Sequence, residues 1–192
     1  MPDYLTFASE FLHSPMVTAS PVPTSVALSD IAVAPVPERG EPVVLELGAG
    51  TGSTSEVVQR HLGGRGRHLA VEANPRMARL LRREYPEVEV ICRDAREVVR
   101  RLSADGVRVD LVFSTLPISV TAPPATTIFA ELGALLSPTG AVTQIQHSWV
   151  RPLPIARQVR RNLETHFEEV LISRTVWHNP PPAARRPRPP VP

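Results

Sequence analysis

The sequence predicts an α/β fold with a mostly parallel sheet and helices on both of its faces. Short apolar segments alternate with helical patterns from residue 43 to residue 176. Such alternation is typical of strand–helix–strand units, whose right-handed crossovers build a parallel sheet. A glycine-rich turn at residues 48–52 follows the first apolar segment. The chain has 192 residues, which is enough for one such domain with a buried core.

The apolar segments have the length and composition of strands that are buried on both faces. The first reads Val-Val-Leu-Glu-Leu at residues 43–47 and leads directly into the glycine turn. We expect strands at residues 43–47, 67–71, 88–91, 109–113, 141–146 and 168–176.

Capping residues mark the starts of helices between these strands. Ser53 and Thr54 are N-cap types that follow the glycine turn, and Asn74 precedes Pro75, a residue favoured at the first helical position. The turn residues 137–140 end a helix later in the chain. We expect helices at residues 53–62, 75–85, 95–102, 126–136 and 155–166.

An amphipathic helix is expected near the N-terminus, at residues 3–13. Tyr4, Phe7 and Phe11 fall on one face of it, and Pro15 stops it. This aromatic face can pack on the core, line a hydrophobic acceptor site or touch a membrane. The helix carries acidic residues and no basic one, which is poor for anionic lipid surfaces.

The composition divides the chain into three segments. Residues 1–40, with a second short helix at residues 24–33, are expected to form a helical lid, and residues 41–178 form the domain itself. Residues 179–192 are a flexible tail rich in proline and arginine, with seven prolines in its last thirteen positions. Because proline removes donors from a strand ladder, we expect a polyproline-like or disordered tail.

The glycine turn predicts a ligand site at the carboxyl end of the first strand. Gly48, Gly50 and Gly52 allow a sharp turn and a close approach of the backbone to a ligand, over the start of a helix. A nicotinamide fingerprint would place its third glycine at Ser53. The pattern is instead E-x-G-x-G-x-G, with the acid at Glu46.

Acidic residues end the next two strands. Glu72 follows the second strand, 20 residues after Gly52, and a carboxylate there can accept hydrogen bonds from both hydroxyls of a ribose. Asp94 comes just after the third strand. Together with the glycine turn, these residues resemble the cofactor site of S-adenosylmethionine (SAM) dependent methyltransferases with a Rossmann-like fold.

A wider resemblance is to the bacterial phospholipid N-methyltransferases, also called phosphatidylethanolamine N-methyltransferases. It covers most of residues 5–183 and keeps the order and spacing of the family's segments. The similar segments are residues 7–15, 23–28 and 45–52, Glu72-Ala73-Asn74-Pro75, residues 85–88, Asp94-Ala95-Arg96, Ser114-Thr115-Leu116-Pro117, and residues 149–154 and 179–183.

The resemblance implies that SAM is the cofactor and that a methyl group is transferred to an amine. The implied acceptor is the headgroup of phosphatidylethanolamine or a similar aminolipid. In this family the Asp at position 94 would bind the adenine amino group. The implied cofactor-binding residues are Glu46, Gly48, Ala49, Gly50, Gly52, Glu72, Ala73, Asp94, Ala95 and Ser114.

Three departures from the family's pattern concern the acceptor and the end of the sheet. Residues 114–117 read Ser-Thr-Leu-Pro where the family has Gly-Leu-Pro, and His147 stands where the family tends to have an aromatic residue. The family also has a seventh strand, antiparallel to its neighbours, which Pro187 and the later prolines make doubtful. The strand at residues 168–176 is then expected to pair with residues 141–146 directly or to leave an exposed edge that favours a homodimer.

Methyl transfer to an amine requires an unprotonated nucleophile held in line with the methyl group. A general base helps, and His147 at the carboxyl end of the fifth strand is the candidate, with a histidine bonded to backbone as the alternative. Ser114 and Thr115 are the other catalytic candidates, as groups that orient the acceptor. The candidate substrate-binding residues are Tyr4, Phe7, Phe11, Leu116 and Pro117.

Composition excludes several other classes of site. The 21 basic residues are all arginines, spread along the chain beside glutamates, so we expect no nucleic-acid partner. Cys92 is the only cysteine, which favours a reducing compartment, and the six scattered histidines form no metal-ligand pattern. We expect a cytoplasmic protein, with peripheral contact at the inner membrane surface as a further option.

Three alternatives to lipid methylation remain open. The first is a methyltransferase of hydrophobic small molecules, such as secondary metabolites, on the same scaffold. The second is an rRNA adenine methyltransferase, but residues 114–117 lack the Asn and the aromatic residue with which that class stacks a flipped base. The third is a non-catalytic module that binds SAM.

Overall fold

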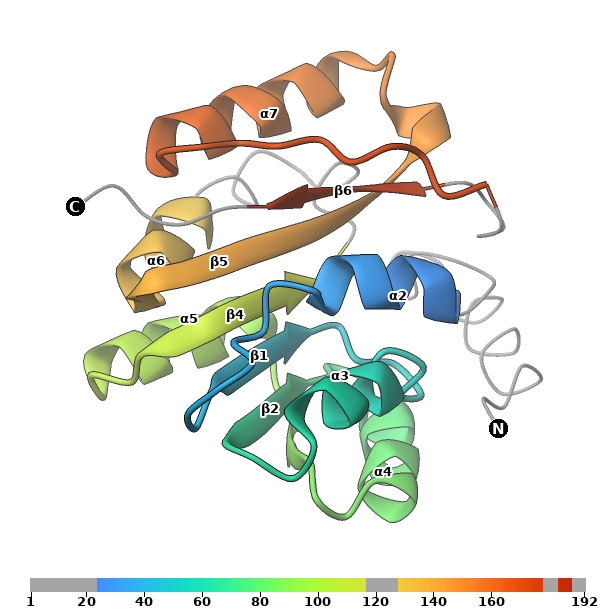
Figure 1. Ribbon diagram of the computed structural model, residues 1–192, viewed down its shortest axis with the longest axis vertical. Coiled ribbons are helices and arrows are strands. Elements are labelled where there is room, and N and C mark those ends of the chain that lie inside the picture. Colours follow the sequence, from blue (N-terminus) through green and yellow to red (C-terminus); the bar gives the residue numbers. More distant parts are fainter. Residues whose placement is uncertain (1–23, 117–127, 178–182, 188–192) are drawn as a thin grey trace.

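The computed structural model describes residues 24–116, 128–177 and 183–187, the last range by its backbone. Its strands are β1 (Val43–Leu47), β2 (Arg67–Val71), β3 (Glu89–Ile91), β4 (Val109–Ser114), β5 (Leu136–His147) and β6 (Ala183–Pro187). They form one sheet in the order β3-β2-β1-β4-β5-β6 (Figure 1). The first five strands are parallel, and β6 is antiparallel to β5.

Helices cover both faces of the sheet, which confirms the predicted α/β architecture (Figure 1). They are α2 (Val26–Val33), α3 (Ser55–Leu62), α4 (Pro75–Glu84), α5 (Ala95–Ala104), α6 (Ile128–Leu135) and α7 (Pro154–His166), with a 3-10 turn η2 (Ser148–Val150). Val33 of α2 and Val57 of α3 pack against one face of β1, whereas Val98, Phe129 and Val159 of α5, α6 and α7 belong to the core on the other face.

Successive residues of β1 face opposite layers, as a strand between two helical layers requires. Leu45 and Leu47 contact the layer of α5, α6 and α7, whereas Val44 contacts the layer of α2 and α3. Because five strands are parallel, their carboxyl ends meet at one edge of the sheet. The glycine turn after β1 and Glu72 after β2 both lie at this edge.

The local start and stop signals act as the sequence predicts. The side chain of Asn74 caps α4 by accepting hydrogen bonds from the backbone N–H groups of Arg76 and Met77, and Pro75 is the first helical residue. Gly63 ends α3 in the left-handed conformation, with φ 58°. α3 begins two residues later than predicted, after Thr54.

One correction concerns the start of β5. Residues 136–140 were expected to end a helix and form a turn, but β5 begins at Leu136 and pairs with Val109. Asp110 accounts for this, because its two oxygens accept hydrogen bonds from Ser137 Oγ at 2.8 Å and from Val43 N at 2.9 Å. These bonds hold the segment against the sheet, with a register shift between Val109 and Leu111.

A second correction concerns residues 168–176, which do not form the predicted sixth strand. They run as an extended segment without a strand ladder, apart from one isolated bridge at Val176 (Figure 1). Leu171 and Ile172 remain 47% and 37% exposed, so their apolar pattern does not bury a strand face. Hydrophobic alternation therefore predicted extended backbone correctly and its pairing wrongly.

A third correction concerns the tail, which forms β6 at the edge of the sheet beside β5. Ala183 pairs with His147 and Pro187 with Thr143. The prolines do not prevent this strand, because Pro187 is its last residue and the strand lies at an edge. Neither alternative expected for this part of the sheet is found, since β5 pairs with β6 and not with residues 168–176. The homodimer stays a prediction.

Several predictions fall outside the described residues. The helix at residues 3–13 and the first two residues of the helix at 126–136 are among them. The lid at residues 1–40 is described only from residue 24 onward, so its closure stays a prediction. Within the described residues, no helix combines the length and apolarity needed to cross a bilayer.

Candidate functional site

The glycine turn depends on backbone conformations that favour glycine. Gly48, Gly50 and Gly52 have φ values of 81°, 59° and 93°. A Cβ added to Gly48 would lie 2.8 Å from the Thr115 hydroxyl oxygen, and one added to Gly52 would lie 2.5 Å from Cε2 of Tyr85. The turn is therefore tightly enclosed by its neighbours, and substitution would displace it.

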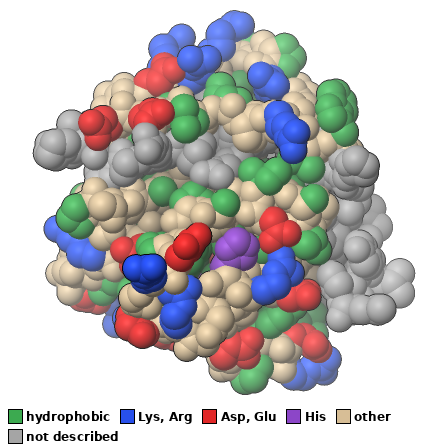
Figure 2. All heavy atoms as spheres, viewed as in Figure 1, with side chains coloured by type: hydrophobic (Ala, Val, Ile, Leu, Met, Phe, Trp, Pro, Cys, Tyr) green, Lys and Arg blue, Asp and Glu red, His purple; other side chains and the backbone are tan. Residues whose placement is uncertain are grey.

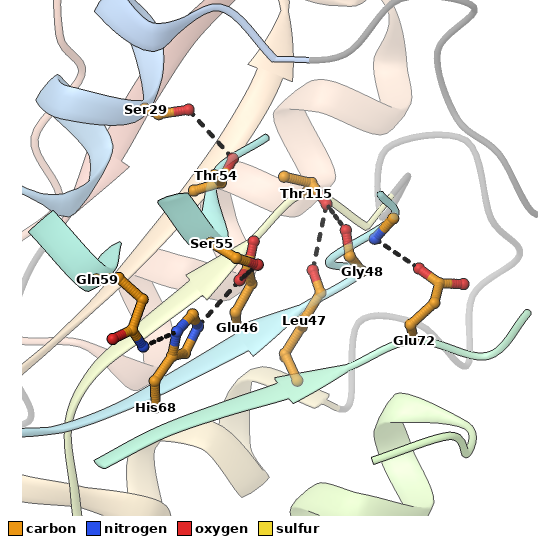
Figure 3. A network of polar contacts seen from close by, with 11 residues as sticks. Ser29, Glu46, Leu47, Gly48, Thr54, Ser55, Gln59, His68, Glu72 and Thr115 are labelled. Atoms are coloured by element: carbon orange, nitrogen blue, oxygen red, sulfur yellow. Dashed lines mark hydrogen bonds and ion pairs between the residues drawn. The ribbon is translucent and has the colours of Figure 1, made fainter. Parts of the chain in front are cut away.

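Glu72, which follows β2, holds this turn at Gly50 (Figure 3). Its Oε2 accepts a hydrogen bond from Gly50 N, and its Oε1 accepts one from Asn74 N, both at 2.8 Å. The side chain is buried, and this burial raises the pKa of its carboxyl above the ordinary value of 4.5, against the opposing effect of the two backbone hydrogen bonds. Each carboxylate oxygen keeps a further lone pair for a ligand hydroxyl.

The loop after β4 holds the turn from the other side. The Thr115 hydroxyl lies 2.6 Å from the carbonyl oxygen of Gly48 and donates to it (Figure 3). Ser114 is fully buried, and its hydroxyl accepts a hydrogen bond from Leu116 N at 3.4 Å. Thr115 thus holds the turn in place through its hydroxyl. These contacts do not support direct contact of either hydroxyl with an acceptor molecule.

Asp94 and its neighbours lie at the start of α5. Oδ1 of Asp94 caps the helix by accepting hydrogen bonds from Arg96 N at 2.9 Å and Glu97 N at 3.3 Å. The residue is exposed, and no hydrogen bond to its Oδ2 occurs within the part of the chain that the structure describes. Ala95 is buried behind it, whereas Ala73 is exposed beside Glu72.

Glu46 lies beneath the turn rather than at its surface. Its Oε2 accepts a hydrogen bond from Ser55 Oγ at 2.6 Å and another from His68 Nε2 at 3.0 Å (Figure 3). The other oxygen, Oε1, is buried without a hydrogen-bond partner among the described residues. Glu46 therefore serves first to hold β1, β2 and α3 together under the site.

Sequence reasoning missed Thr51 and His68. Thr51 stands inside the glycine turn with its hydroxyl oxygen buried and without a partner in the described part of the chain. His68 lies in a strand buried on both faces. It pairs with Val44, which is two residues before Glu46 in β1, so the side chains of His68 and Glu46 are on the same face of the sheet. Two polar residues inside adjacent buried strands need partners, and this signal in the sequence pointed to the Glu46–His68 contact.

His147 is the last residue of β5, so it lies at the carboxyl ends of the parallel strands, as the glycine turn does. Ser114 pairs with Gln144, so His147 lies three residues further along, about 10 Å at the usual rise of a strand. Its ring stacks on that of Trp149, with centroids 6.4 Å apart and planes at 11°. The structure thus leaves its role as a base a prediction, and adds an aromatic neighbour that is 57% exposed.

The remaining candidates are only partly described. Leu116 is half-buried, and its carbonyl oxygen accepts a hydrogen bond from Gln144 Nε2 at 3.1 Å. Tyr4, Phe7, Phe11 and Pro117 lie outside the described residues.

The charges visible in the space-filling view are mixed in sign. Figure 2 shows acidic and basic side chains interspersed over this face of the molecule. Opposite charges also meet in ion pairs of the described residues, such as Arg67 with Glu89 and Arg93 with Glu97. No group of three or more possible metal ligands occurs in the described ranges.

The donor set fits a cofactor with a ribose and an adenine. The turn presents glycine backbone, Glu72 has free lone pairs for two hydroxyls, and Asp94 keeps one carboxylate oxygen. The buried hydroxyl of Thr51 is a polar atom within the same turn that still lacks a partner in the described chain. A ligand of this kind would satisfy groups that the fold leaves unsatisfied.

Comparison with known proteins places the chain among methyltransferases. A family model described as "Methyltransferase domain" matches residues 44–140. The ornithine lipid N-methyltransferase of Singulisphaera acidiphila is 31% identical over 156 residues, which cover 78% of this chain and 81% of that protein.

Solved structures of low sequence identity share the fold. The O-methyltransferase from Bacillus cereus, in complex with SAH, has a TM-score of 0.69 at 16% identity and covers 95% of this chain and 90% of its own. The Aeropyrum pernix fibrillarin with natively bound SAM has a TM-score of 0.63 at 20% identity, with coverages of 80% and 68%. The chain therefore belongs to the methyltransferase domain family, as a SAM-dependent methyltransferase.

Proposed function

We propose that this protein is an aminolipid N-methyltransferase, which transfers methyl groups from SAM to the amine of a lipid headgroup. The observation that carries the proposal is the 31% identity with an ornithine lipid N-methyltransferase over most of both chains. Phosphatidylethanolamine and ornithine-type lipids both present an amine, and both are acceptors of the proposed class. Peripheral contact with a membrane surface follows from a lipid acceptor.

The cofactor-binding residues form one continuous set around the turn. Backbone groups at Gly48 to Gly52 approach the cofactor, and Glu72 accepts hydrogen bonds from its ribose hydroxyls. Asp94 and Ala95 lie next along the edge, at the adenine. When bound, SAM supplies a methyl group that is activated by its sulfonium. The residues of the chain hold and orient it, and Glu46 acts mainly from beneath.

The acceptor amine has to lose its proton before it can attack. His147 is the proposed base, since it lies at the carboxyl end of β5 and imidazole is the side-chain group most often used as a general base. The stacked Trp149 orients the His147 ring and shields one of its faces from water. Thr115 acts indirectly, because its hydroxyl holds the turn.

Methyl transfer to lipid vesicles tests the proposal. Purified protein is incubated with methyl-labelled SAM and vesicles that contain phosphatidylethanolamine, ornithine lipid or only phosphatidylcholine, and the label is followed in the lipid extract by mass spectrometry. Glu72→Ala serves as the inactive variant. Glu164→Ala is the matched control, because this exposed residue of α7 forms a surface ion pair with Arg160.

The expected result is label in one of the two aminolipids with the wild type and with Glu164→Ala, and none with Glu72→Ala or in phosphatidylcholine. A parallel reaction contains a hydrophobic small-molecule amine in place of the vesicles, and label that appears only in this reaction would contradict the lipid acceptor and favour the small-molecule alternative. SAM binding without transfer to any of these amines would contradict the enzymatic proposal altogether.

A further inference from the structure

A buried polar network connects β1, β2 and α3 directly below the glycine turn. The side chains of Glu46 and His68 are 1% and 0% exposed, and they are joined by the 3.0 Å contact between Oε2 and Nε2. Gln59 lies 3.0 Å from the other ring nitrogen of His68, and Ser55 donates to Glu46 (Figure 3). A polar cluster buried this deeply costs stability unless each member is hydrogen-bonded.

His68 has a side-chain partner at each of its ring nitrogens. Its Nε2 lies 3.0 Å from Oε2 of Glu46, and its Nδ1 lies 3.0 Å from the side-chain amide of Gln59. Because a carboxylate oxygen can only accept, Nε2 donates to Glu46. Glu46 therefore receives a directed hydrogen bond from His68 in addition to that from Ser55.

The network reaches the cofactor turn through the first turn of α3. Ser55 is the first residue of α3, and Thr54 before it contacts Ser29 of α2 through their hydroxyls at 3.1 Å. Gln59 is one helical turn after Ser55, so His68 and Glu46 hold α3 at two successive turns on one face. The glycine turn leads into the start of α3, so the position of this helix start determines how the turn faces a ligand.

We propose that His68 is a positioning residue of the cofactor site, which holds Glu46 and through it the start of α3. The imidazole is buried away from solvent, and its hydrogen-bond contacts are to Glu46 and Gln59. Its effect passes through the Glu46 carboxylate to Ser55. The inference rests on the SAM cofactor and not on the identity of the acceptor, so the lipid proposal and this one fail independently.

Removal of the imidazole tests this role. His68→Leu leaves Oε2 of Glu46 with Ser55 alone, and calorimetry should show SAM affinity at least about tenfold lower, the effect of losing a hydrogen bond to a charged group. His68→Gln places an amide nitrogen near the position of Nε2 and an amide oxygen that can accept from Gln59, so it should restore most of the affinity. Neither measurement needs an acceptor.

Hydrogen exchange of the protein without SAM gives a second readout. The amides of the first turn of α3 should exchange faster in His68→Leu than in the wild type, and those of α7 should exchange at the same rate. His61→Leu is the matched control, because His61 lies in α3 but its side chain contacts Asp30. It should change neither SAM affinity nor exchange at the start of α3.

The kinetic constants separate positioning from simple stabilisation. Positioning raises the KM for SAM while kcat at saturating SAM stays near that of the wild type. A uniform rise in exchange over the whole domain, with unchanged SAM affinity in the folded protein, would overturn the proposal. Should His68→Leu not fold, Gln59→Leu removes the side chain that holds the other ring nitrogen of His68, and unchanged affinity and exchange in that variant would overturn the proposal equally.

Discussion

The cofactor half of the molecule and its carboxyl-terminal half are built in different ways. In the cofactor half, β1, the glycine turn, α3 and β2 are held by buried hydrogen bonds from Glu46, His68 and Glu72. In the other half, around β5, η2 and β6, the large side chains of Trp149 and Trp177 are 57% and 75% exposed. The first region is held together by buried polar contacts, whereas the second presents apolar surface to its surroundings.

The difference teaches which part of the function is preorganised. The cofactor turn has its donors and carboxylates in place, so little of the binding free energy of SAM is lost in ordering the protein. The exposed tryptophans are side chains of a kind enriched where an apolar and an aqueous phase meet. Variants on the two sides should therefore have separable effects, on SAM binding on one side and on sheet stability and the acceptor on the other.

The largest effect is expected for Glu72→Ala. The change leaves the N–H groups of Gly50 and Asn74 without their carboxylate and removes the proposed acceptor for the ribose hydroxyls. Calorimetry should show SAM affinity at least about 100-fold lower, which corresponds to about 2.7 kcal/mol. A folded variant that binds SAM as the wild type does would remove Glu72 from the site.

Deletion of β6 should come next, and its effect should be on stability. Without residues 183–187, β5 loses its antiparallel partner and exposes a strand edge. We expect the melting temperature to fall by more than about 5 °C, equivalent to over 1 kcal/mol in a domain of this size. Removal of residues 188–192 alone is the control. Equal melting temperatures for both truncated proteins would mean that β6 contributes nothing to the fold.

Acidic pH should weaken SAM binding and, at the same time, stabilise the free protein through Glu72. Burial raises the pKa of this carboxyl above 4.5, so it takes up a proton more readily in the folded than in the unfolded protein. Its contribution to stability is therefore unfavourable at high pH and improves as the pH falls through the raised pKa. If the ionised carboxylate binds the ribose hydroxyls of SAM, as proposed, SAM affinity should fall over the same range.

Glu72→Gln tests this pH dependence, because it keeps the shape of the side chain and cannot titrate. Calorimetric titrations from neutral to mildly acidic pH should show a declining affinity for the wild type and a flatter profile for the variant. A decline of equal size in both proteins would assign the titration to another group.

Most of the cofactor half was predictable from the sequence because its signals are local. The pattern from Glu46 to Gly52 gives strand, turn and helix within ten residues, and Asn74 and Pro75 mark the next helix start. Predicted bounds for β1 and β2 agree with the structure. A short-range motif states both the backbone conformation and the chemistry of its residues, so few alternatives remain.

The carboxyl-terminal half was less predictable because its structure depends on long-range pairing. Residues 168–176 have the pattern of a strand, but β5 takes Ala183–Pro187 as its neighbour. Nothing local in the tail identifies it as that partner. Four residues without proline precede Pro187, and these are long enough to form most of β6. His68 was missed although each of two adjacent buried strands carries a polar residue. The register of β1 and β2, in which Val44 pairs with His68, shows that the Glu46 and His68 side chains share a face.

A comparison of two glycine variants tests most directly whether SAM sits over the turn. Gly48 and Gly63 both have positive φ, at 81° and 58°, so alanine at either position costs about 1 kcal/mol of backbone strain. They differ in their surroundings, since a Cβ at Gly48 would meet Thr115 at 2.8 Å, whereas one at Gly63 would meet nothing within 4 Å. Calorimetry should show SAM affinity about tenfold lower for Gly48→Ala, roughly 1.4 kcal/mol, and unchanged for Gly63→Ala. Wild-type affinity in a folded Gly48→Ala protein would contradict the placement of the cofactor over this turn.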